Sequence, residues 1–200
     1  MTAFNPAAAP LIVFGGAFDP PHLGHVLLAT VALSALPEAN LGVFPTWTHP
    51  SGKSAHAEFA HRLQMCRRAM APLDRTEVSD LERELAGPGY TLHLLQALRR
   101  RKPTPLLYLL MGADQYAARH RWHRFDAVTA LATPLVVGRE GADASVRTLP
   151  ITLPGLSSSA VRARIQVGHA LVGWLPAAVT RYIEAQGLYR KSAPDDADHG

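Results

Sequence analysis

Residues 11–25 of this chain read LIVFGGAFDPPHLGH. The apolar run at 11–14 is short and ends in two glycines, a pattern typical of a fully buried β-strand. An Asp-Pro-Pro turn follows, and residues 23–36 then have helical spacing up to Pro37. We therefore expect a strand, a tight turn and a helix in direct succession.

The turn between that strand and helix predicts an anion site. Gly15 and Gly16 allow the backbone to approach a phosphate closely. His22 and His25 are three residues apart, a spacing that puts both imidazole rings on one face of a helix. The helix N-terminus adds free N–H groups and a partial positive charge. We expect Gly24 to leave space for an adenine ring or the end of a second strand. The alternative is a turn rich in glycine and proline with two solvent-exposed histidines.

Apolar runs and helical patterns alternate through the rest of the chain. Strands are expected at 41–44, 76–79, 105–111 and 133–137, and helices at 58–70, 90–101, 159–167 and 177–186. This alternation predicts the α/β class, with a doubly wound parallel sheet in a single domain at 11–190. We expect a flexible leader at 1–10 and a disordered tail at 191–200. In such sheets ligands bind beyond the carboxyl ends of the strands.

The composition narrows the classes of partner. A net charge of +4 is too small for a dedicated nucleic-acid binder, and the basic residues are not interleaved with aromatic ones. No apolar run approaches the ~18 residues of a membrane span, and the first ten residues lack the features of a signal peptide. The one cysteine, Cys66, excludes an internal disulfide and is expected to pack in a helix. We expect a cytoplasmic protein without a membrane partner, a nucleic-acid partner or a protein-bound metal, since no metal-binding motif is present.

A second anion site is predicted near the end of the chain, where residues 156–162 read LSSSAVR. Ser158 or Ser159 is a good N-cap for the helix that follows. Exposed hydroxyl and N–H groups there, with Arg162 one turn further on, would form a cradle for phosphate oxygens. The alternative is an ordinary capped helix.

Residues 15–25 resemble the signature of the HxGH nucleotidylyltransferases, which share a Rossmann-like fold with class I aminoacyl-tRNA synthetases. In that superfamily both histidines contact the ATP phosphates and stabilise the pentavalent transition state. The resemblance implies catalytic roles for His22 and His25. It also implies ATP contacts from Gly15, Gly16, Ala17, Phe18 and Gly24.

Residues 156–162 are similar to the superfamily's I-S-S-T-x-I-R element, which binds the β and γ phosphates of ATP. Leu156 stands in place of isoleucine and Ser159 in place of threonine, and both changes keep the chemical type of the side chain. The resemblance implies that Arg162 holds the leaving pyrophosphate. It implies ATP contacts from Ser157, Ser158 and Ser159.

Other segments look like the bacterial nicotinate-nucleotide adenylyltransferase family, in the same order along the chain. They read ERELAGPGYT at 82–91, LMGAD at 110–114, RWHRF at 121–125 and YIEAQGLYR at 182–190. With the first motif, the resemblance covers about residues 11–190. It implies that the pyridine-bearing substrate is bound by Gly87, Tyr90, Thr91, Gly112, Asp114, Trp122 and His123.

The residue types suit such a substrate, although several have a second interpretation. Trp122 offers a stacking face worth ~1 kcal/mol to a pyridine ring, or it packs in the core. In the family, backbone N–H groups near the positions of Gly87 and His123 bind the substrate carboxylate. Thr91 either caps the helix that it opens or touches the substrate. Asp114 either binds a ribose hydroxyl or caps a helix.

The loop after the second strand departs from the family pattern. The family has Pro-Pro-His-Lys there, whereas residues 47–53 read WTHPSGK. The resemblance carries a phosphate-binding role to Lys53 and none to His49. Trp47 either closes over a substrate or packs.

The resemblance implies transfer of AMP from ATP to nicotinate mononucleotide, giving deamido-NAD and pyrophosphate, with Mg²⁺ carried by the ATP phosphates. Two other acceptors stay open: nicotinamide mononucleotide, and the acceptor of the phosphopantetheine adenylyltransferases. The non-enzyme alternative is a nucleotide-binding regulator that has lost catalysis, against which both histidines and Arg162 stand. The oligomeric state is not readable from the sequence, and a homo-oligomer is compatible with it.

Overall fold

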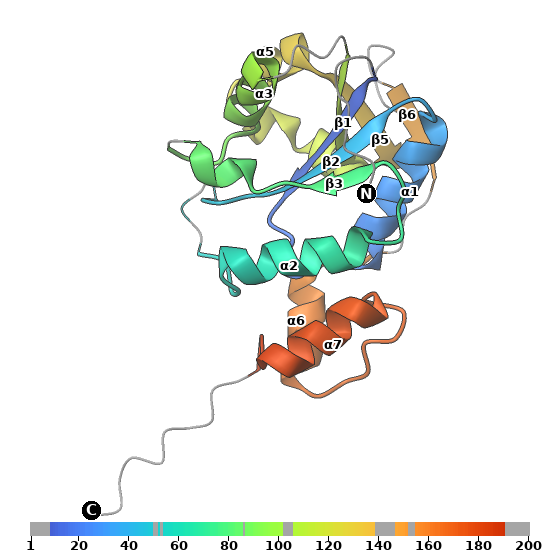
Figure 1. Ribbon diagram of the computed structural model, residues 1–200, viewed down its shortest axis with the longest axis vertical. Coiled ribbons are helices and arrows are strands. Elements are labelled where there is room, and N and C mark those ends of the chain that lie inside the picture. Colours follow the sequence, from blue (N-terminus) through green and yellow to red (C-terminus); the bar gives the residue numbers. More distant parts are fainter. Residues whose placement is uncertain are drawn as a thin grey trace, which may run out of the picture.

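The computed structural model describes residues 9–49, 52, 54–85, 87–101, 106–138, 147–151 and 155–190. Over these residues the chain forms one sheet of six parallel strands in the order β3-β2-β1-β4-β5-β6 (Figure 1). The strands are β1 (Leu11–Gly16), β2 (Asn40–Pro45), β3 (Thr76–Val78), β4 (Leu107–Gly112), β5 (Thr133–Gly138) and β6 (Arg147–Pro150). The predicted doubly wound, Rossmann-like α/β fold is confirmed.

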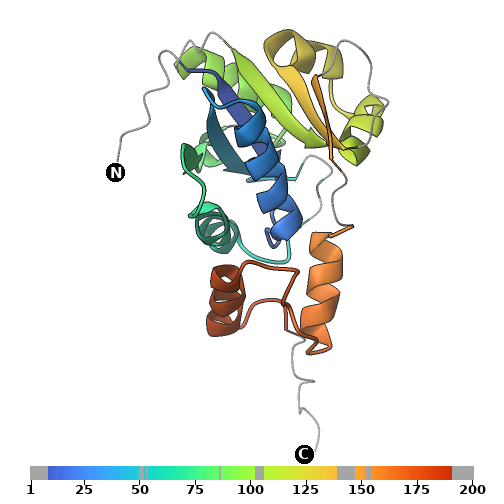
Figure 2. The same ribbon diagram turned by 90° about the vertical axis from the view of Figure 1, so that its right-hand side faces the viewer.

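Helices connect the strands and cover both faces of the sheet (Figures 1 and 2). The α-helices are α1 (Leu23–Ala35), α2 (Phe59–Met70), α3 (Thr91–Arg101), α4 (Ala113–Ala117), α5 (Phe125–Leu131), α6 (Ser158–Gln166) and α7 (Ala177–Gln186). Two 3-10 turns are η1 (Leu81–Glu84) and η2 (Arg119–Arg121). α6 and α7 lie together at one end of the molecule, where α7 packs against α2.

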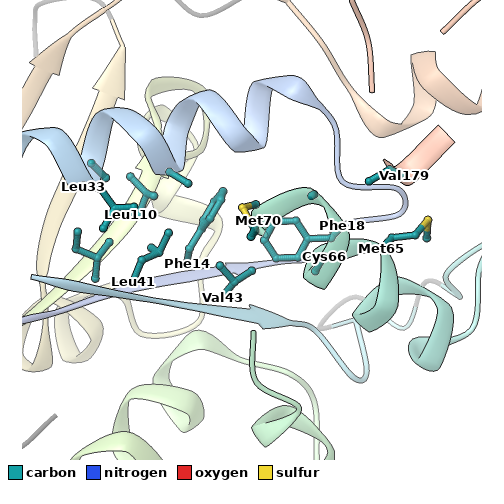
Figure 3. Packing of buried hydrophobic residues seen from close by; sticks show 14 of the residues in the cluster. Phe14, Phe18, Leu33, Leu41, Val43, Met65, Cys66, Met70, Leu110 and Val179 are labelled. Atoms are coloured by element: carbon teal, nitrogen blue, oxygen red, sulfur yellow. The ribbon is translucent and has the colours of Figure 1, made fainter. Parts of the chain in front are cut away.

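β1 shows why the predicted sheet is covered on both faces. Ile12 and Phe14 join one apolar cluster, whereas Leu11 and Val13 join the other, because successive side chains of a strand point to opposite faces. The first cluster includes residues of α1, α2 and α7, and Figure 3 shows its packing around Phe14. The second cluster includes residues of α3, α4 and α5. Burial on both faces explains why this strand reads as an unbroken apolar run.

The strand order places a crevice at the end of β1. β1 pairs with β2 on one side and with β4 on the other, and the connections run outward from there in opposite directions. In open α/β sheets such a switch point is where ligands bind, beyond the carboxyl ends of the strands. The glycine pair of the first motif lies at this end of β1.

Several elements were missed by the sequence patterns. These are β6, α4, α5 and both 3-10 turns, which are between three and seven residues long and too short to show a clear period. The buried Cys66 agrees with the packing expected from the sequence, and Gly187 ends α7 in the left-handed conformation (φ 63°). Residues 1–8 of the expected leader and the whole expected tail at 191–200 lie outside the described residues. Among the described helices, none has the length and apolar character needed to cross a membrane.

Candidate active site

Two adjoining pockets open at the carboxyl ends of the central strands. The larger, about 550 Å³, is walled by the ends of β1, β4 and β5 and by the first residues of α1 and α6. The smaller, about 270 Å³, is walled by one residue of η1, by the start of α3 and by residues 121–123. Both are lined by Gly15, Gly16, Ala17 and Gln115. The end of β1 is therefore a common wall, at which ligands in the two pockets would meet.

His22 and His25 line the larger pocket from the start of α1. The backbone N–H of His22 donates to His25 Nδ1 at 3.0 Å, and the two ring centroids are 3.7 Å apart. The Phe18 ring packs edge-on against His25, with 4.9 Å between centroids. Phe18 itself takes a positive φ of 49°, which is costly for a residue other than glycine and is common at functional sites. Backbone and ring contacts together hold the histidine pair in place.

Both imidazoles are neutral near pH 7. Burial lowers the pKa of His22 to about 4. Burial, and then the neighbouring His22, lowers the pKa of His25 well below its usual value of 6.5. Among the described residues, His22 Nδ1 has no hydrogen-bond partner although it is buried. A phosphate in this pocket would supply both an acceptor and a negative charge, which would raise the pKa of each ring.

The glycines of the first motif leave space for different things. A Cβ at Gly24 would lie 3.0 Å from His22 Nδ1, so this glycine makes room for the His22 ring. The neighbours of that position are His22 and Leu156 and not the end of a strand, which was one of the two alternatives. Gly24 also lines the larger pocket, and the adenine alternative stays a prediction. A Cβ at Gly15 would meet nothing within 4 Å, and Gly15 lines both pockets. The backbone at Gly15 is therefore open to a ligand.

The start of α6 forms the opposite wall of the larger pocket. The N-cap is Ser157, whose Oγ accepts from the backbone N–H of Ala160 at 3.2 Å, so the prediction of Ser158 or Ser159 is wrong by one or two residues. Ser158 Oγ donates to the carbonyl of Pro20 at 2.8 Å and ties α6 to the turn after β1. Ser157 and Ser158 line the larger pocket, whereas Ser159 is exposed and does not. The positive ends of α1 and α6 thus meet at one pocket.

Gly112 and Asp114, expected beside the pyridine-bearing substrate, line the larger pocket instead. Gly112 is the N-cap of α4, so Asp114 is not a cap. Asp114 Oδ1 accepts from the backbone N–H of Gln115 at 2.8 Å, and the side chain is exposed. Because Asp114 lines the larger pocket, its carboxylate can accept a hydrogen bond from a hydroxyl group of a ligand bound there.

Aromatic side chains gather at the smaller pocket. Tyr90 and His123 line it as a stacked pair, with ring centroids 4.2 Å apart and planes 18° apart. Trp122 lines it too, and its ring makes a T-shaped contact with the Phe125 ring, with 5.9 Å between the centroids. Trp122 is therefore half-buried: one part of the ring packs against the second cluster and another part lines the smaller pocket. Packing in the core and stacking on a ligand are thus compatible for this residue.

Thr91 and Gly87 take different places. Thr91 is the first residue of α3 and lines the smaller pocket. Gly87 is exposed in a turn with a φ of 85° and does not line either pocket. The positive φ explains the glycine at that position without a ligand.

A buried carboxyl, Glu82, was missed by the sequence patterns. It lines the smaller pocket, is 4% exposed, and among the described residues its Oε2 has no hydrogen-bond partner. Burial raises its pKa from 4.5 to about 7, against a hydrogen bond from the backbone of Trp47. A Cβ at Gly89 would lie 2.5 Å from the Thr48 carbonyl oxygen and 3.1 Å from Oε2, so this glycine makes room first for the Thr48 backbone and then for the carboxyl. Its place as the first residue of the segment ERELAGPGYT at 82–91 was the sequence signal that could have identified it.

Arg162 lines a third pocket, of about 400 Å³, which adjoins the larger one at Ala17 and Ser158. Its Nη1 donates to the carbonyl of Asp19 at 2.6 Å and lies 3.9 Å from Asp19 Oδ2. Lys53, expected to bind phosphate on this side, lies outside the described residues. His49 lines both the second and third pockets, although the sequence assigned it no role.

Residues 13–164 match a family model described as "Cytidylyltransferase-like". The chain belongs to the cytidylyltransferase-like family. It is 39% identical over 183 residues to a protein named "Probable nicotinate-nucleotide adenylyltransferase" from Anaeromyxobacter sp. (strain K), covering 90% of this chain and 96% of that one. A protein of the same name from Thermus thermophilus is 36% identical over 183 residues, covering 89% of this chain and 98% of that one. The chain is therefore a nucleotidyltransferase.

The fold is shared with a solved structure. The Plasmodium falciparum nicotinic acid mononucleotide adenylyltransferase, complexed with NaAD, matches with a TM-score of 0.75 and 19% identity over 90% of this chain and 97% of that one. At 19% identity, this similarity shows a shared fold and nothing further.

Within the cytidylyltransferase-like fold, tertiary structure adds Gln115 and Asp19 to the site. Gln115 lines both main pockets, and only its position after the GAD segment could have indicated it.

The role of Trp47 was left open by the sequence. Its ring makes a T-shaped contact with the Phe59 ring, with 4.9 Å between the centroids, and the Arg83 guanidinium lies over it. Trp47 stays 46% exposed. Among the described residues, no group of three or more His, Cys, Asp or Glu side chains could hold a metal ion.

Proposed function

We propose that this nucleotidyltransferase transfers AMP from ATP to nicotinate mononucleotide, giving deamido-NAD and pyrophosphate. One observation carries the proposal: two pockets of unequal size share the open wall at the end of β1, beside a histidine pair of which His22 is buried and His25 is half-buried. The two relatives and the solved structure carry names for this activity. A two-substrate transfer needs such adjoining sites, since holding both reactants in place removes much of the barrier.

The larger pocket suits ATP. It offers the neutral N–H groups of His22 and His25, and two helix N-termini that favour phosphate oxygens. The 5′-phosphate of the acceptor attacks the α phosphorus in line, a new P–O bond forms, and the bond to the bridging oxygen of the β phosphate breaks. The imidazoles stabilise the charge that develops on the α phosphate oxygens.

The smaller pocket suits the pyridine ring of the acceptor. Trp122 and the stacked pair of Tyr90 and His123 give it aromatic walls, and Thr91 adds a hydroxyl. Stacking on such a face contributes about 1 kcal/mol. The ring then lies on the far side of the β1 wall from the adenosine part of ATP.

The leaving pyrophosphate is expected at the third pocket, where Arg162 and Ser158 lie. Mg²⁺ would arrive on the ATP phosphates and keep several waters, as this ion does when bound by a phosphate substrate. The carboxylate that could contact the ion or its waters is Asp114, which is exposed and lines the larger pocket. A cytoplasmic location and the absence of a nucleic-acid partner stay predictions.

The test compares acceptors with purified protein, ATP and Mg²⁺. Pyrophosphate release is followed with nicotinate mononucleotide, nicotinamide mononucleotide and phosphopantetheine. We expect the highest kcat/KM with nicotinate mononucleotide, and a KM for it that rises about fivefold in Trp122→Ala but less in Trp122→Phe. Higher efficiency on the amide or on phosphopantetheine would overturn the choice of substrate. No release with any acceptor would point to a nucleotide-binding regulator.

A further inference from the structure

Tyr189 reaches the active-site turn from the far end of the chain. It follows α7, and its hydroxyl donates to Asp19 Oδ1 at 2.8 Å across 170 positions of sequence. Its φ is 63°, in the left-handed region that a residue other than glycine rarely adopts. Tyr189 therefore combines an unfavourable backbone conformation with a hydrogen bond to Asp19, and strained residues of this kind cluster at functional sites. Burial, followed by Asp19, raises the pKa of Tyr189, so the hydroxyl remains a donor.

The Asp19 carboxylate accepts hydrogen bonds from two segments that are far apart in the sequence. Its Oδ2 accepts from the backbone N–H of His56 at 2.7 Å, and its Oδ1 accepts from that of Ala57 at 3.1 Å as well as from Tyr189. The residue is 5% exposed. A buried carboxylate that accepts several hydrogen bonds is held in one orientation, because each lost bond would leave a desolvated charge less well paired.

Asp19 in turn holds the guanidinium of Arg162. Nη1 of Arg162 donates to the Asp19 carbonyl at 2.6 Å, and the same atom lies 3.9 Å from Oδ2. An arginine side chain has five N–H donors in a rigid fork, so fixing one end of the fork sets the direction of the rest. Arg162 lines the third pocket together with Ser158, which also lines the larger pocket.

We propose that Tyr189 is a positioning residue which, through Asp19, aims the Arg162 guanidinium at the pyrophosphate of the nucleotidyl transfer. The inference rests on the proposed function, because it assigns the third pocket to the leaving group. Tyr189 itself touches no substrate. Its hydroxyl completes the set of donors that keeps the turn at Asp19 in the conformation that Arg162 uses.

The experiment removes only the hydroxyl, with Tyr189→Phe. The matched control is Tyr182→Phe on α7, whose hydroxyl pairs with His61 Nδ1 at 2.9 Å away from the three pockets. The reaction is run in reverse, from the dinucleotide and pyrophosphate, well below the midpoint of thermal unfolding of each variant. We expect the KM for pyrophosphate to rise roughly threefold to tenfold in Tyr189→Phe, the size of one lost hydrogen bond. The KM for the dinucleotide and all constants of Tyr182→Phe should change less than twofold.

A second background separates positioning from stability. In Arg162→Ala, adding Tyr189→Phe should change the KM for pyrophosphate by less than twofold, because the residue that Tyr189 positions is gone. An equal loss in both backgrounds, or an unchanged pyrophosphate KM in Tyr189→Phe, would overturn the inference. A wild-type protein without adenylyl transfer would instead overturn the proposed function, so the two failures are distinguishable.

Discussion

The backbone N–H of His22 donates to Nδ1 of His25 at 3.0 Å, and the two rings lie 3.7 Å apart between centroids. Because Nδ1 of His25 is the acceptor, the proton of the neutral ring is on Nε2. The hydrogen bond therefore fixes both the position and the tautomer of His25 at the wall of the larger pocket. The HxGH spacing serves this contact between cap and third helical residue as well as placing two rings on one face.

His25→Ala should lower kcat for AMP transfer by about 100-fold to 1,000-fold, the usual loss when one donor to a developing oxyanion is removed. The KM for ATP should change by less than about fivefold, because the two helix N-termini remain. Steady-state kinetics on both constants checks this. His169→Ala is the control, since His169 is exposed in the connection between α6 and α7. Near-full activity of His25→Ala would remove the histidine from the mechanism.

The depressed pKa of His22 makes stability depend on pH. Above pH 6.5 the ring is neutral in both states and has no effect. Below that value the unfolded chain binds a proton more readily, so the free energy of unfolding falls by up to roughly 3 kcal/mol as the pH approaches 4. His22→Asn keeps a good N-cap and removes the titration. Urea unfolding between pH 4 and 7 should show a smaller fall for this variant, and an identical fall would contradict the assignment.

Two glycines of neighbouring strands, Gly15 at the end of β1 and Gly42 within β2, should respond to alanine in opposite ways. Gly15→Ala places a Cβ in open space at the wall of both pockets, so we expect a change in unfolding free energy below about 1 kcal/mol and a KM for ATP raised at least about tenfold. Gly42→Ala places a Cβ 2.6 Å from the Phe44 ring in the core, so we expect a loss of about 1 to 3 kcal/mol in stability. Urea unfolding and ATP kinetics on both variants check the contrast. The reverse outcome would mean that Gly15 is a folding position.

Glu82→Gln should remove a penalty that grows with pH. The folded-state pKa of Glu82 is raised from 4.5 to about 7, so the folded protein holds this proton longer than the unfolded chain does. Stability from this group is full below pH 4.5 and is lost as the pH rises to about 7, by up to roughly 3 kcal/mol. We expect the glutamine variant to gain stability relative to wild type between pH 5 and 8, measured by urea unfolding. A difference that does not vary with pH would show that the carboxyl is ionised throughout.

The α/β class could be predicted because the residue patterns that decide it are local. Residues 11–14 are apolar at every position since both faces of β1 are buried, and Pro37 follows α1 closely. The histidine pair was found for a similar reason, since a three-residue spacing at a helix start is a local relationship. β6 could not be found in this way: its residues RTLP show no alternation, and only pairing with β5 makes them a strand.

The chain's sequence by itself determined the strand, turn and helix of residues 11–25, the imidazole pair and the α/β class, because neighbours in sequence make those contacts. Only the tertiary structure decided which pocket each residue lines. It moved Gly112 and Asp114 to the larger pocket, left Gly87 and Ser159 outside, and brought Glu82 into the smaller one. It also joined Tyr189 to Asp19. These contacts link segments far apart in the chain, and their geometry is set by how helices pack on the sheet, which no local pattern records.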